Sequence, residues 1–282
     1  MSTGVLPVQI RGHGPALMLL HGYTGRGQSM AALARAFEND YTTLAPDLPG
    51  HGDALGRPLG DACDFDDCLR RLVATLASTG SARAHWLGYS MGARLALGCA
   101  VRHPDSVASL VLLAGRAGIE DPAERAARRR ADEALAARIE SGGVEAFVDE
   151  WLAQPLFATL RRLGPQFLAG ERRARLANDA HGLAASLRGL GPAAQPALFD
   201  ELPKVHVPVL LVAGELDVRF VELAHGLARR LPRAEVCVIP DAGHAAHLEQ
   251  PEAFARVVRD FLRRAASPAS SLASLPVQEI AS

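Results

Sequence analysis

The segment Gly-Tyr-Ser-Met-Gly at residues 88–92 lies where an expected strand meets an expected helix. Residues 84–88 are predicted to form the strand and residues 91–101 the helix, which ends before Pro104. The glycines two residues before and after Ser90 let the backbone turn sharply and leave the hydroxyl exposed. The same residues could also form a turn without a catalytic role. Because the turn needs a strand followed directly by a helix, it favours an α/β fold.

The rest of the chain repeats this alternation of short apolar runs and helical stretches, which is typical of a parallel sheet with crossover helices. The run Leu17–Leu20 is fully apolar, as in a strand buried on both faces. A chain of 282 residues can bury the core of one large α/β domain. The expected strands are 17–20, 41–45, 84–88, 110–113, 208–213 and 235–239, and the expected helices are 29–37, 66–77, 91–101 and 251–264.

The strand pattern is interrupted in the middle of the chain. Residues 115–201 contain no convincing strand and are rich in Ala, Arg and Glu, as in helices. We therefore expect an α/β core made of residues 1–114 and 202–265, with residues 115–201 inserted as a helical cap after the position that the sixth strand takes in this fold. Residues 266–282 are rich in Ser, Ala and Pro and are predicted to be a disordered tail.

The composition of the chain limits the kinds of binding partner and the cellular location that we expect. The net charge of −1 gives no overall field that would recruit nucleic acid or an acidic membrane surface. We see neither a signal peptide nor an apolar run long enough to cross a membrane, and we expect a cytoplasmic protein. The four cysteines have neither metal-ligand nor disulfide-framework spacing, so we expect reduced thiols at Cys63, Cys68, Cys99 and Cys237.

A serine hydroxyl reacts only when a histidine takes its proton and a carboxylate orients that histidine. After a turn of this kind the expected chain order is Ser, then Asp or Glu, then His. His244 follows the last expected strand, and Asp217 follows the strand before it. Glu215 and Asp241 compete for the role of the acid: Glu215 precedes the usual loop position, and Asp241 is too close to His244 in sequence.

Another histidine, His247, is interpreted as a surface or packing residue. The segment His21–Gly25 follows the first buried strand. We expect the backbone N–H of Tyr23 to lie beside that of Met91 and to form an oxyanion hole with it. The side chain of His21 is expected to be structural, and residues 46–52 are expected to serve as scaffolding at the same face.

With these residues the chain resembles the α/β-hydrolase superfamily over residues 8–262, which implies a mostly parallel sheet flanked by helices. A narrower resemblance rests on the joint order of several motifs, namely Gly88–Arg94, Glu124–Arg128 with Asp132, Trp151 with Gln154–Phe157, Arg175–Asn178, Gln195–Pro196 and Gly214–Asp217 with Phe220. Together they resemble the 2-succinyl-6-hydroxy-2,4-cyclohexadiene-1-carboxylate synthase (SHCHC synthase) family of menaquinone biosynthesis.

This resemblance implies a lyase that eliminates pyruvate from a cyclohexene substrate, SEPHCHC, which bears several carboxylates. In that family the triad serine is thought to remove a ring proton as a base, without an acyl-enzyme. Ser90, Asp217 and His244 would be the catalytic residues here. We expect no metal or redox cofactor, because neither a ligand set nor a G-x-G-x-x-G loop is present. The expected partner is a small polycarboxylate; oligomeric state is not predicted.

The resemblance also implies a set of substrate-binding residues, Tyr89, Arg94, Arg128, Trp151 and Arg175. A polycarboxylate is best bound by guanidinium groups, which bind carboxylates in a bidentate manner. Arg94 lies one helical turn after Ser90 and therefore near the reacting centre, although it could instead form a structural salt bridge. Arg125 and Arg130 compete with Arg128, and all the cap arginines could simply be exposed, since the chain has 29 Arg and only one Lys. Tyr89 and Trp151 could instead pack the cap against the core.

Two positions depart from the family pattern. Ala93 stands where the family usually has a second Gly, and Gly115–Gly118 replaces the more usual Ser-Pro-Gly turn. The second change alters the hinge into the cap and the substrate contacts expected there. Two other functions are kept open: a serine hydrolase that acts on carboxylate-bearing esters or C–C bonds, and a hydrolase-like binding protein without activity.

Overall fold

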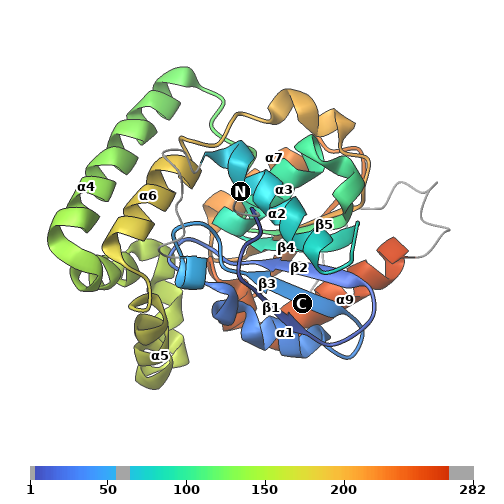
Figure 1. Cartoon of the computed structure of the whole chain (residues 1–282), viewed down its shortest axis with the longest axis horizontal. Helices are drawn as coiled ribbons and strands as arrows, with labels where there is room; N and C mark the ends of the chain where they lie inside the picture. The colour runs from blue at the N-terminus through green and yellow to red at the C-terminus, as the bar shows by residue number, and fades with distance from the viewer. Residues whose placement is uncertain (1–3, 55–63, 267–282) are drawn as a thin grey trace.

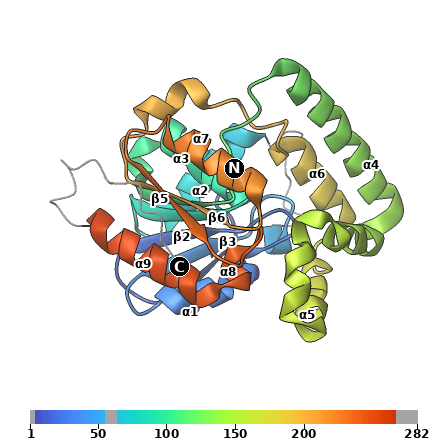
Figure 2. The same ribbon diagram turned by 180° about the vertical axis from the view of Figure 1, so that it is seen from behind.

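The computed structural model describes residues 4–54 and 64–266, which form a seven-stranded sheet with helices on both faces (Figures 1 and 2). The strand order is β1-β3-β2-β4-β5-β6-β7, and every pairing is parallel except that of β1 with β3. The strands are β1 (Val8–Arg11), β2 (Ala16–Leu20), β3 (Thr42–Pro46), β4 (Ala84–Tyr89), β5 (Val107–Leu113), β6 (Val209–Gly214) and β7 (Ala234–Ile239).

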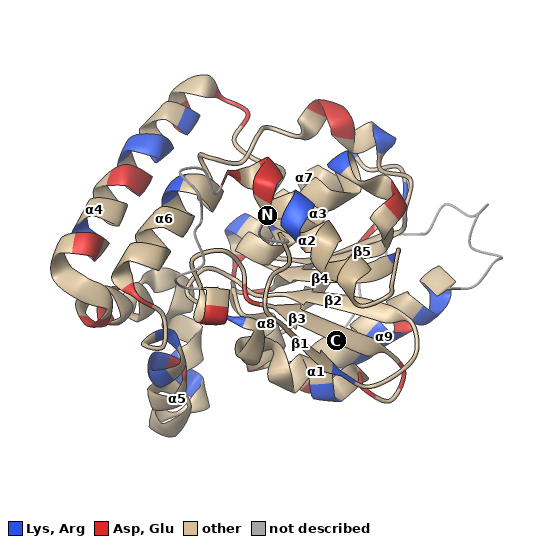
Figure 3. Cartoon of the chain, viewed as in Figure 1, with Lys and Arg blue, Asp and Glu red and all other residues tan. Residues whose placement is uncertain are grey.

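The central strands have the apolar sequences that a sheet covered on both faces requires. All five residues of β2 and all six of β6 are buried. Arginine and acidic residues are concentrated on the helices and are absent from β2 and β4 at the centre of the sheet (Figure 3). This architecture confirms the predicted α/β-hydrolase fold class.

Two layers of helices bury the two faces of the sheet. Helices α1 and α9 pack on one face around Phe37 and Phe254, while α2, α3 and α7 pack on the other around Leu69 and Leu95. The helices of the core are α1 (Ala31–Phe37), α2 (Phe65–Ser78), α3 (Met91–Arg102), α7 (Val218–Ala228), α8 (Ala246–Glu249) and α9 (Pro251–Ala266), with short 3-10 turns at Gly27–Met30, Gly52–Ala54, Pro104–Ser106 and Phe199–Lys204.

A helical segment that follows β5 and precedes β6 in the sequence lies beside the carboxyl ends of the strands (Figure 1). It consists of α4 (Pro122–Ala153), a 3-10 segment η4 (Pro155–Leu163), α5 (Pro165–Arg175) and α6 (Ala180–Leu190). Helices α4 and α6 pack against each other through their own apolar cluster, which includes Ile139, Phe147 and Leu187. We refer to residues 115–201 as the cap.

The structure contains one strand that is not predicted from the sequence. The described residues before Ala16 form this strand, and the cap follows β5. That strand, β1, was missed because its four residues are only half-buried or exposed and contain no apolar run. The predicted tail at residues 266–282 falls outside the described residues apart from Ala266, as does Cys63. Within residues 4–54 and 64–266, no helix combines the length and the apolarity needed to cross a membrane.

Candidate active site

Ser90 lies at the sharp turn between β4 and α3, in a backbone conformation that non-glycine residues rarely adopt (φ 52°, ψ −104°). Two glycines make this turn sterically allowed. A Cβ at Gly88 would collide with the carbonyl group of Gly92, and one at Gly92 would collide with the carbonyl group of Leu20. The Ser90 amide donates to the carbonyl oxygen of Leu113 (2.8 Å), which fixes the turn to the neighbouring strand. Its hydroxyl is thereby held at the carboxyl edge of the sheet.

His244 and Asp217 come from the loops after β7 and β6 and meet Ser90 at this edge. The Nε2 atom of His244 lies 3.2 Å from the Ser90 Oγ, and its Nδ1 atom lies 2.7 Å from Asp217 Oδ2. When the imidazole carries its proton on Nδ1, it donates to the carboxylate and Nε2 can accept the serine proton. The His244 side chain is 2% exposed and that of Asp217 is 9% exposed, so both are shielded from bulk water.

Of the three acids considered, Asp217 is the one that lies against His244 Nδ1. The Glu215 carboxylate instead accepts a hydrogen bond from the Asp241 backbone amide (3.0 Å), which links the loops after β6 and β7. His247 is buried and packs on the ring of Tyr89, with 4.6 Å between the ring centroids. Burial lowers the pKa of His247 to about 3, so that its imidazole is neutral at pH 7. Of the two roles considered for it, the structure gives His247 the packing role.

The two backbone amides that were predicted to form an oxyanion hole have no hydrogen-bond acceptor among the described residues. Met91 follows Ser90 directly as the first residue of α3, where a helix amide has no acceptor within the helix. Neither its N–H nor that of Tyr23 donates a hydrogen bond to any described atom. The loop that contains Tyr23 is fixed by the tyrosine hydroxyl, which donates to the carbonyl of Leu183 in the cap (2.9 Å). It is also fixed by His21, whose Nε2 accepts from the Leu48 amide (3.0 Å).

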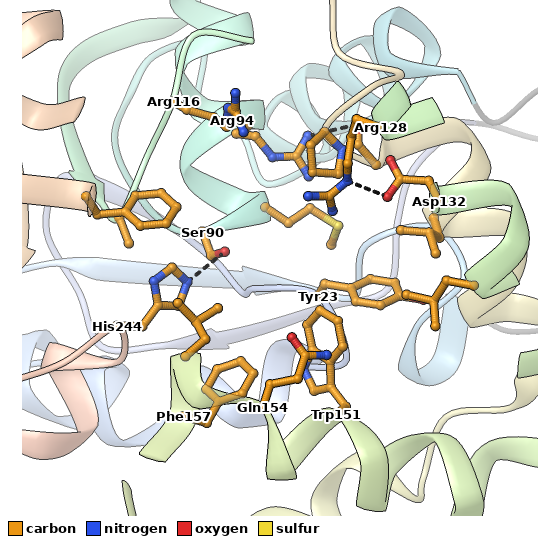
Figure 4. A pocket seen from close by; sticks show the side chains of 18 of the residues that line it. Tyr23, Ser90, Arg94, Arg116, Arg128, Asp132, Trp151, Gln154, Phe157 and His244 are labelled. Carbon is orange, nitrogen blue, oxygen red and sulfur yellow. Dashed lines mark hydrogen bonds and ion pairs between the residues drawn. The ribbon is translucent and has the colours of Figure 1, made fainter. Parts of the chain in front are cut away.

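A cavity of about 480 Å³ opens between this edge of the sheet and the cap. Ser90 and His244 line it together with four arginines, Arg94, Arg116, Arg128 and Arg219. Figure 4 shows the first three on one side of the cavity and Trp151, Gln154 and Phe157 on the other.

Arg94 is 6% exposed and reaches from α3 to the cap. It donates to the carbonyl oxygens of Leu190 (2.7 Å) and Gly191 (3.4 Å). No carboxylate of the described chain forms an ion pair with it, so the alternative of a structural salt bridge does not hold. Burial lowers the pKa of Arg94 to about 9, which still leaves the guanidinium charged at pH 7. A buried cation that forms no ion pair with the described residues therefore faces the cavity, and Asp132 acts on its charge only at longer range.

Among the three competing arginines of α4, Arg128 is the one that lines the cavity. Its Nε donates to Asp132 Oδ1 (2.6 Å), one turn further along the helix. Arg125 instead donates to the carbonyl oxygen of Ala193 (3.2 Å), and Arg130 is exposed on another face of the helix.

Arg175 was expected to contact substrate, but it does not line this cavity. Its guanidinium is paired with Glu171 one turn earlier and also donates to the Thr24 hydroxyl (3.2 Å). The next loop residues continue this contact, since Asn178 Nδ2 donates to the Thr24 carbonyl oxygen (2.8 Å). In this structure Arg175 therefore holds the cap against the loop that contains Tyr23.

Tyr89 and Trp151 line the cavity and also pack the cap onto the core. The Trp151 ring lies 5.2 Å from the Tyr23 ring, and its buried Nε1–H lacks a hydrogen-bond partner among the described residues. The positions of Tyr89 and Trp151 are thus compatible both with substrate contact and with packing of the cap against the core.

Two arginines of the cavity, Arg116 and Arg219, are not among the substrate-binding residues predicted from the sequence. Arg116 belongs to the changed turn after β5, and Arg219 belongs to α7. The sequence signal that could have indicated Arg219 is its position two residues after Asp217, at the start of α7. Among the described residues no three His, Cys, Asp or Glu side chains gather in a group that could hold a metal ion.

An elbow serine followed by an acid and a histidine, at the carboxyl edge of a mostly parallel sheet, defines the class of α/β-hydrolase-fold enzymes. A model of the alpha/beta hydrolase family matches residues 17–257. The 2-succinyl-6-hydroxy-2,4-cyclohexadiene-1-carboxylate synthase of Yersinia pestis bv. Antiqua (strain Nepal516) is 36% identical over 265 residues, which cover 92% of this chain and 92% of that protein. The synthase of the same name from Serratia proteamaculans (strain 568) is 32% identical and covers 88% of this chain and 93% of that protein.

The solved structure of MenH from S. aureus superposes with a TM-score of 0.88 at 28% identity, and covers 95% of this chain and 100% of that one. The chain belongs to the SHCHC synthase family, within the alpha/beta hydrolase family. This confirms the resemblance on which the sequence analysis relied.

Proposed function

We propose that this enzyme is a carbon–oxygen lyase that eliminates pyruvate from SEPHCHC to give 2-succinyl-6-hydroxy-2,4-cyclohexadiene-1-carboxylate, a step of menaquinone biosynthesis. The observation that carries the proposal is the cavity, which places Ser90 and His244 beside guanidinium groups that include the unpaired, buried Arg94. A hydrolase of simple esters has no use for a buried cation next to its serine, whereas a substrate with several carboxylates does.

In this mechanism Ser90 is a base and not an acyl acceptor. Asp217 orients His244 and stabilises the imidazolium that forms when Nε2 takes the serine proton, as the 2.7 Å and 3.2 Å contacts allow. The Ser90 oxygen, thus activated, removes the ring proton next to the succinyl ketone. The electron pair of the broken C–H bond moves onto the ketone oxygen as an enolate.

The developing charge is what the site must stabilise. In this proposal the amides of Tyr23 and Met91, which have no hydrogen-bond acceptor among the described residues, donate to the enolate oxygen, whose charge exists only along the reaction coordinate. When the enolate collapses, the ring forms a C=C bond and the C–O bond to the enolpyruvyl group breaks. The departing enolpyruvate takes up the proton held by the His244 imidazolium and becomes pyruvate. Ser90 keeps the ring proton as its hydroxyl proton, so the enzyme returns to its starting state with no acyl-enzyme formed and no water consumed.

Arg94 and Arg128 bind carboxylates of the substrate and fix the ring over Ser90. Because Arg94 is also bound to two carbonyls of the cap, substrate binding and cap position are linked through this side chain. The apolar side of the cavity, which includes Trp151 and Phe157, accommodates the ring.

The test uses the purified enzyme with SEPHCHC and follows pyruvate with a coupled reductase. We expect stoichiometric release of pyruvate and of the ring product. In parallel, p-nitrophenyl esters distinguish the alternative: a burst of p-nitrophenol with no pyruvate from SEPHCHC would establish a serine hydrolase and overturn the lyase.

A further inference from the structure

A second cavity, of about 460 Å³, lies behind the wall of the active-site cavity. The two cavities share only Arg116 and Arg219 among the described residues that line them. Arg116 comes from the turn after β5, where the cap begins, and Arg219 comes from the first turn of α7 in the core. We call them the arginine pair.

The Arg116 guanidinium is available to contact a ligand. Its Nε donates to the carbonyl oxygen of Gly118 (3.2 Å), which fixes the direction of the side chain. No described acid forms an ion pair with it. In Figure 4 its guanidinium lies next to that of Arg94, on the side of the cavity opposite Trp151.

Arg219 adds a second positive charge to the same wall. It occupies the first turn of α7, where the helix dipole disfavours a cation, and it too lacks an ion-pair partner among the described residues. The acids nearby are few. Glu124 and Asp132 act on Arg116 only at a distance, and Glu222 lines the second cavity.

Two neighbouring guanidinium groups repel each other unless an anion lies between them. Burial lowers the pKa of Arg116, and the charges of Arg219 and Arg128 lower it further, with only partial compensation from Glu124 and Asp132. A carboxylate bound at this wall would offset the repulsion between the two guanidinium groups.

We propose that Arg116 and Arg219 together form an additional carboxylate-binding subsite on the wall between the two cavities. The inference rests on the proposed function only in assuming that the ligand of the main cavity carries several carboxylates. The carboxylate bound there belongs either to the departing pyruvate or to the succinyl arm that stays on the ring; the chemistry is the same for both.

The experiment compares Arg116→Gln, Arg219→Gln and Arg116→Lys with Arg229→Gln. Arg229 lies at the other end of α7 and lines only the second cavity, which makes it a matched control. Pyruvate release from SEPHCHC gives KM and kcat, and calorimetric titration with pyruvate and with succinate gives affinities that need no turnover. Thermal unfolding of each variant shows whether the fold is retained.

We expect Arg116→Gln to raise KM about 10- to 100-fold with kcat changed less than about 3-fold, as for a lost charge-assisted contact. Arg219→Gln should act in the same direction, Arg116→Lys should recover part of the loss, and Arg229→Gln should match the wild type. A loss of affinity about 10-fold or more for pyruvate assigns the subsite to the leaving group. The same loss for succinate assigns it to the retained arm.

The two proposals fail separately. If the wild type releases pyruvate but Arg116→Gln behaves like Arg229→Gln in KM and in both titrations, the subsite is wrong and the lyase stands. If the wild type releases no pyruvate but Arg116→Gln still weakens carboxylate binding, the lyase is wrong and the subsite stands.

Discussion

Three buried histidines should make this enzyme unusually sensitive to mild acid. His21 and His51 brace the loops beneath the cavity, and His247 packs between Tyr89 and Phe254. Burial lowers their pKa values from 6.5 to about 4, 3 and 3, respectively. In the unfolded chain each of these imidazoles binds a proton below pH 6.5, while in the folded chain each remains neutral.

The sign and the size of the effect follow from this difference. Because the folded pKa lies below the unfolded value, stability is fully present above pH 6.5 and is lost as the pH falls toward the folded pKa. Each histidine then lowers the free energy of unfolding by about 1.4 kcal/mol for each pH unit below 6.5. Between pH 7.5 and 5.5 the three together remove about 4 kcal/mol, or very roughly 8 °C in Tm for a chain of this length. Most carboxylates stay ionised over this interval.

The assay is urea unfolding at pH 7.5, 6.5 and 5.5, followed by circular dichroism. His247→Phe removes one of the three groups and keeps an aromatic ring against Tyr89, so we expect it to reduce the loss by about 1.4 kcal/mol. His13→Gln, at an exposed histidine before β2, is the control and should leave the loss unchanged. If the wild type loses less than about 1 kcal/mol over this range, or if His247→Phe loses as much as the wild type, the reasoning is refuted.

Three further substitutions test the site. Asp217→Asn should lower kcat about 10³- to 10⁴-fold with KM changed only a few-fold, because His244 loses the partner that fixes its tautomer. A kcat within 10-fold of the wild type in the pyruvate assay would show that Asp217 has no part in the mechanism. Arg128→Gln should raise KM for SEPHCHC by about 10-fold or more, whereas Arg130→Gln, on an exposed face of the same helix, should not; equal effects of the two would show that Arg128 is not the contact. Gly88→Ala should cost about 2 kcal/mol or more, because its Cβ meets the carbonyl group of Gly92 at the turn; a Tm within about 2 °C of the wild type would contradict the account of the elbow.

Features that depend on short stretches of sequence could be predicted well. The buried strands were evident because apolar runs such as Leu17–Leu20 have few alternatives, and the turn at Ser90 was evident because its glycines are required locally. The positions of Asp217 and His244 followed from the order in which this fold places its loops. By contrast, β1 has no apolar run and forms only by pairing with β3.

Side-chain partners across long sequence separations could not be predicted. Arg94 binds Leu190, which lies 96 residues away, and no local pattern indicates this. Arg175 matches the family pattern but is paired with Glu171 and turned to Thr24. The importance of Arg116 depends on where the turn after β5 meets α7, which only the assembled fold determines.

The most direct test of the central claim is pyruvate release by Ser90→Ala compared with the wild type, at saturating SEPHCHC. The serine oxygen is the proposed base, so the variant should retain its fold. Its rate of pyruvate release should be lower than that of the wild type by a factor of about 10³ or more. Intact-protein mass spectrometry of the wild type during turnover should show no covalent adduct. Undiminished release by Ser90→Ala, or an acyl adduct on the wild-type enzyme, would contradict the account.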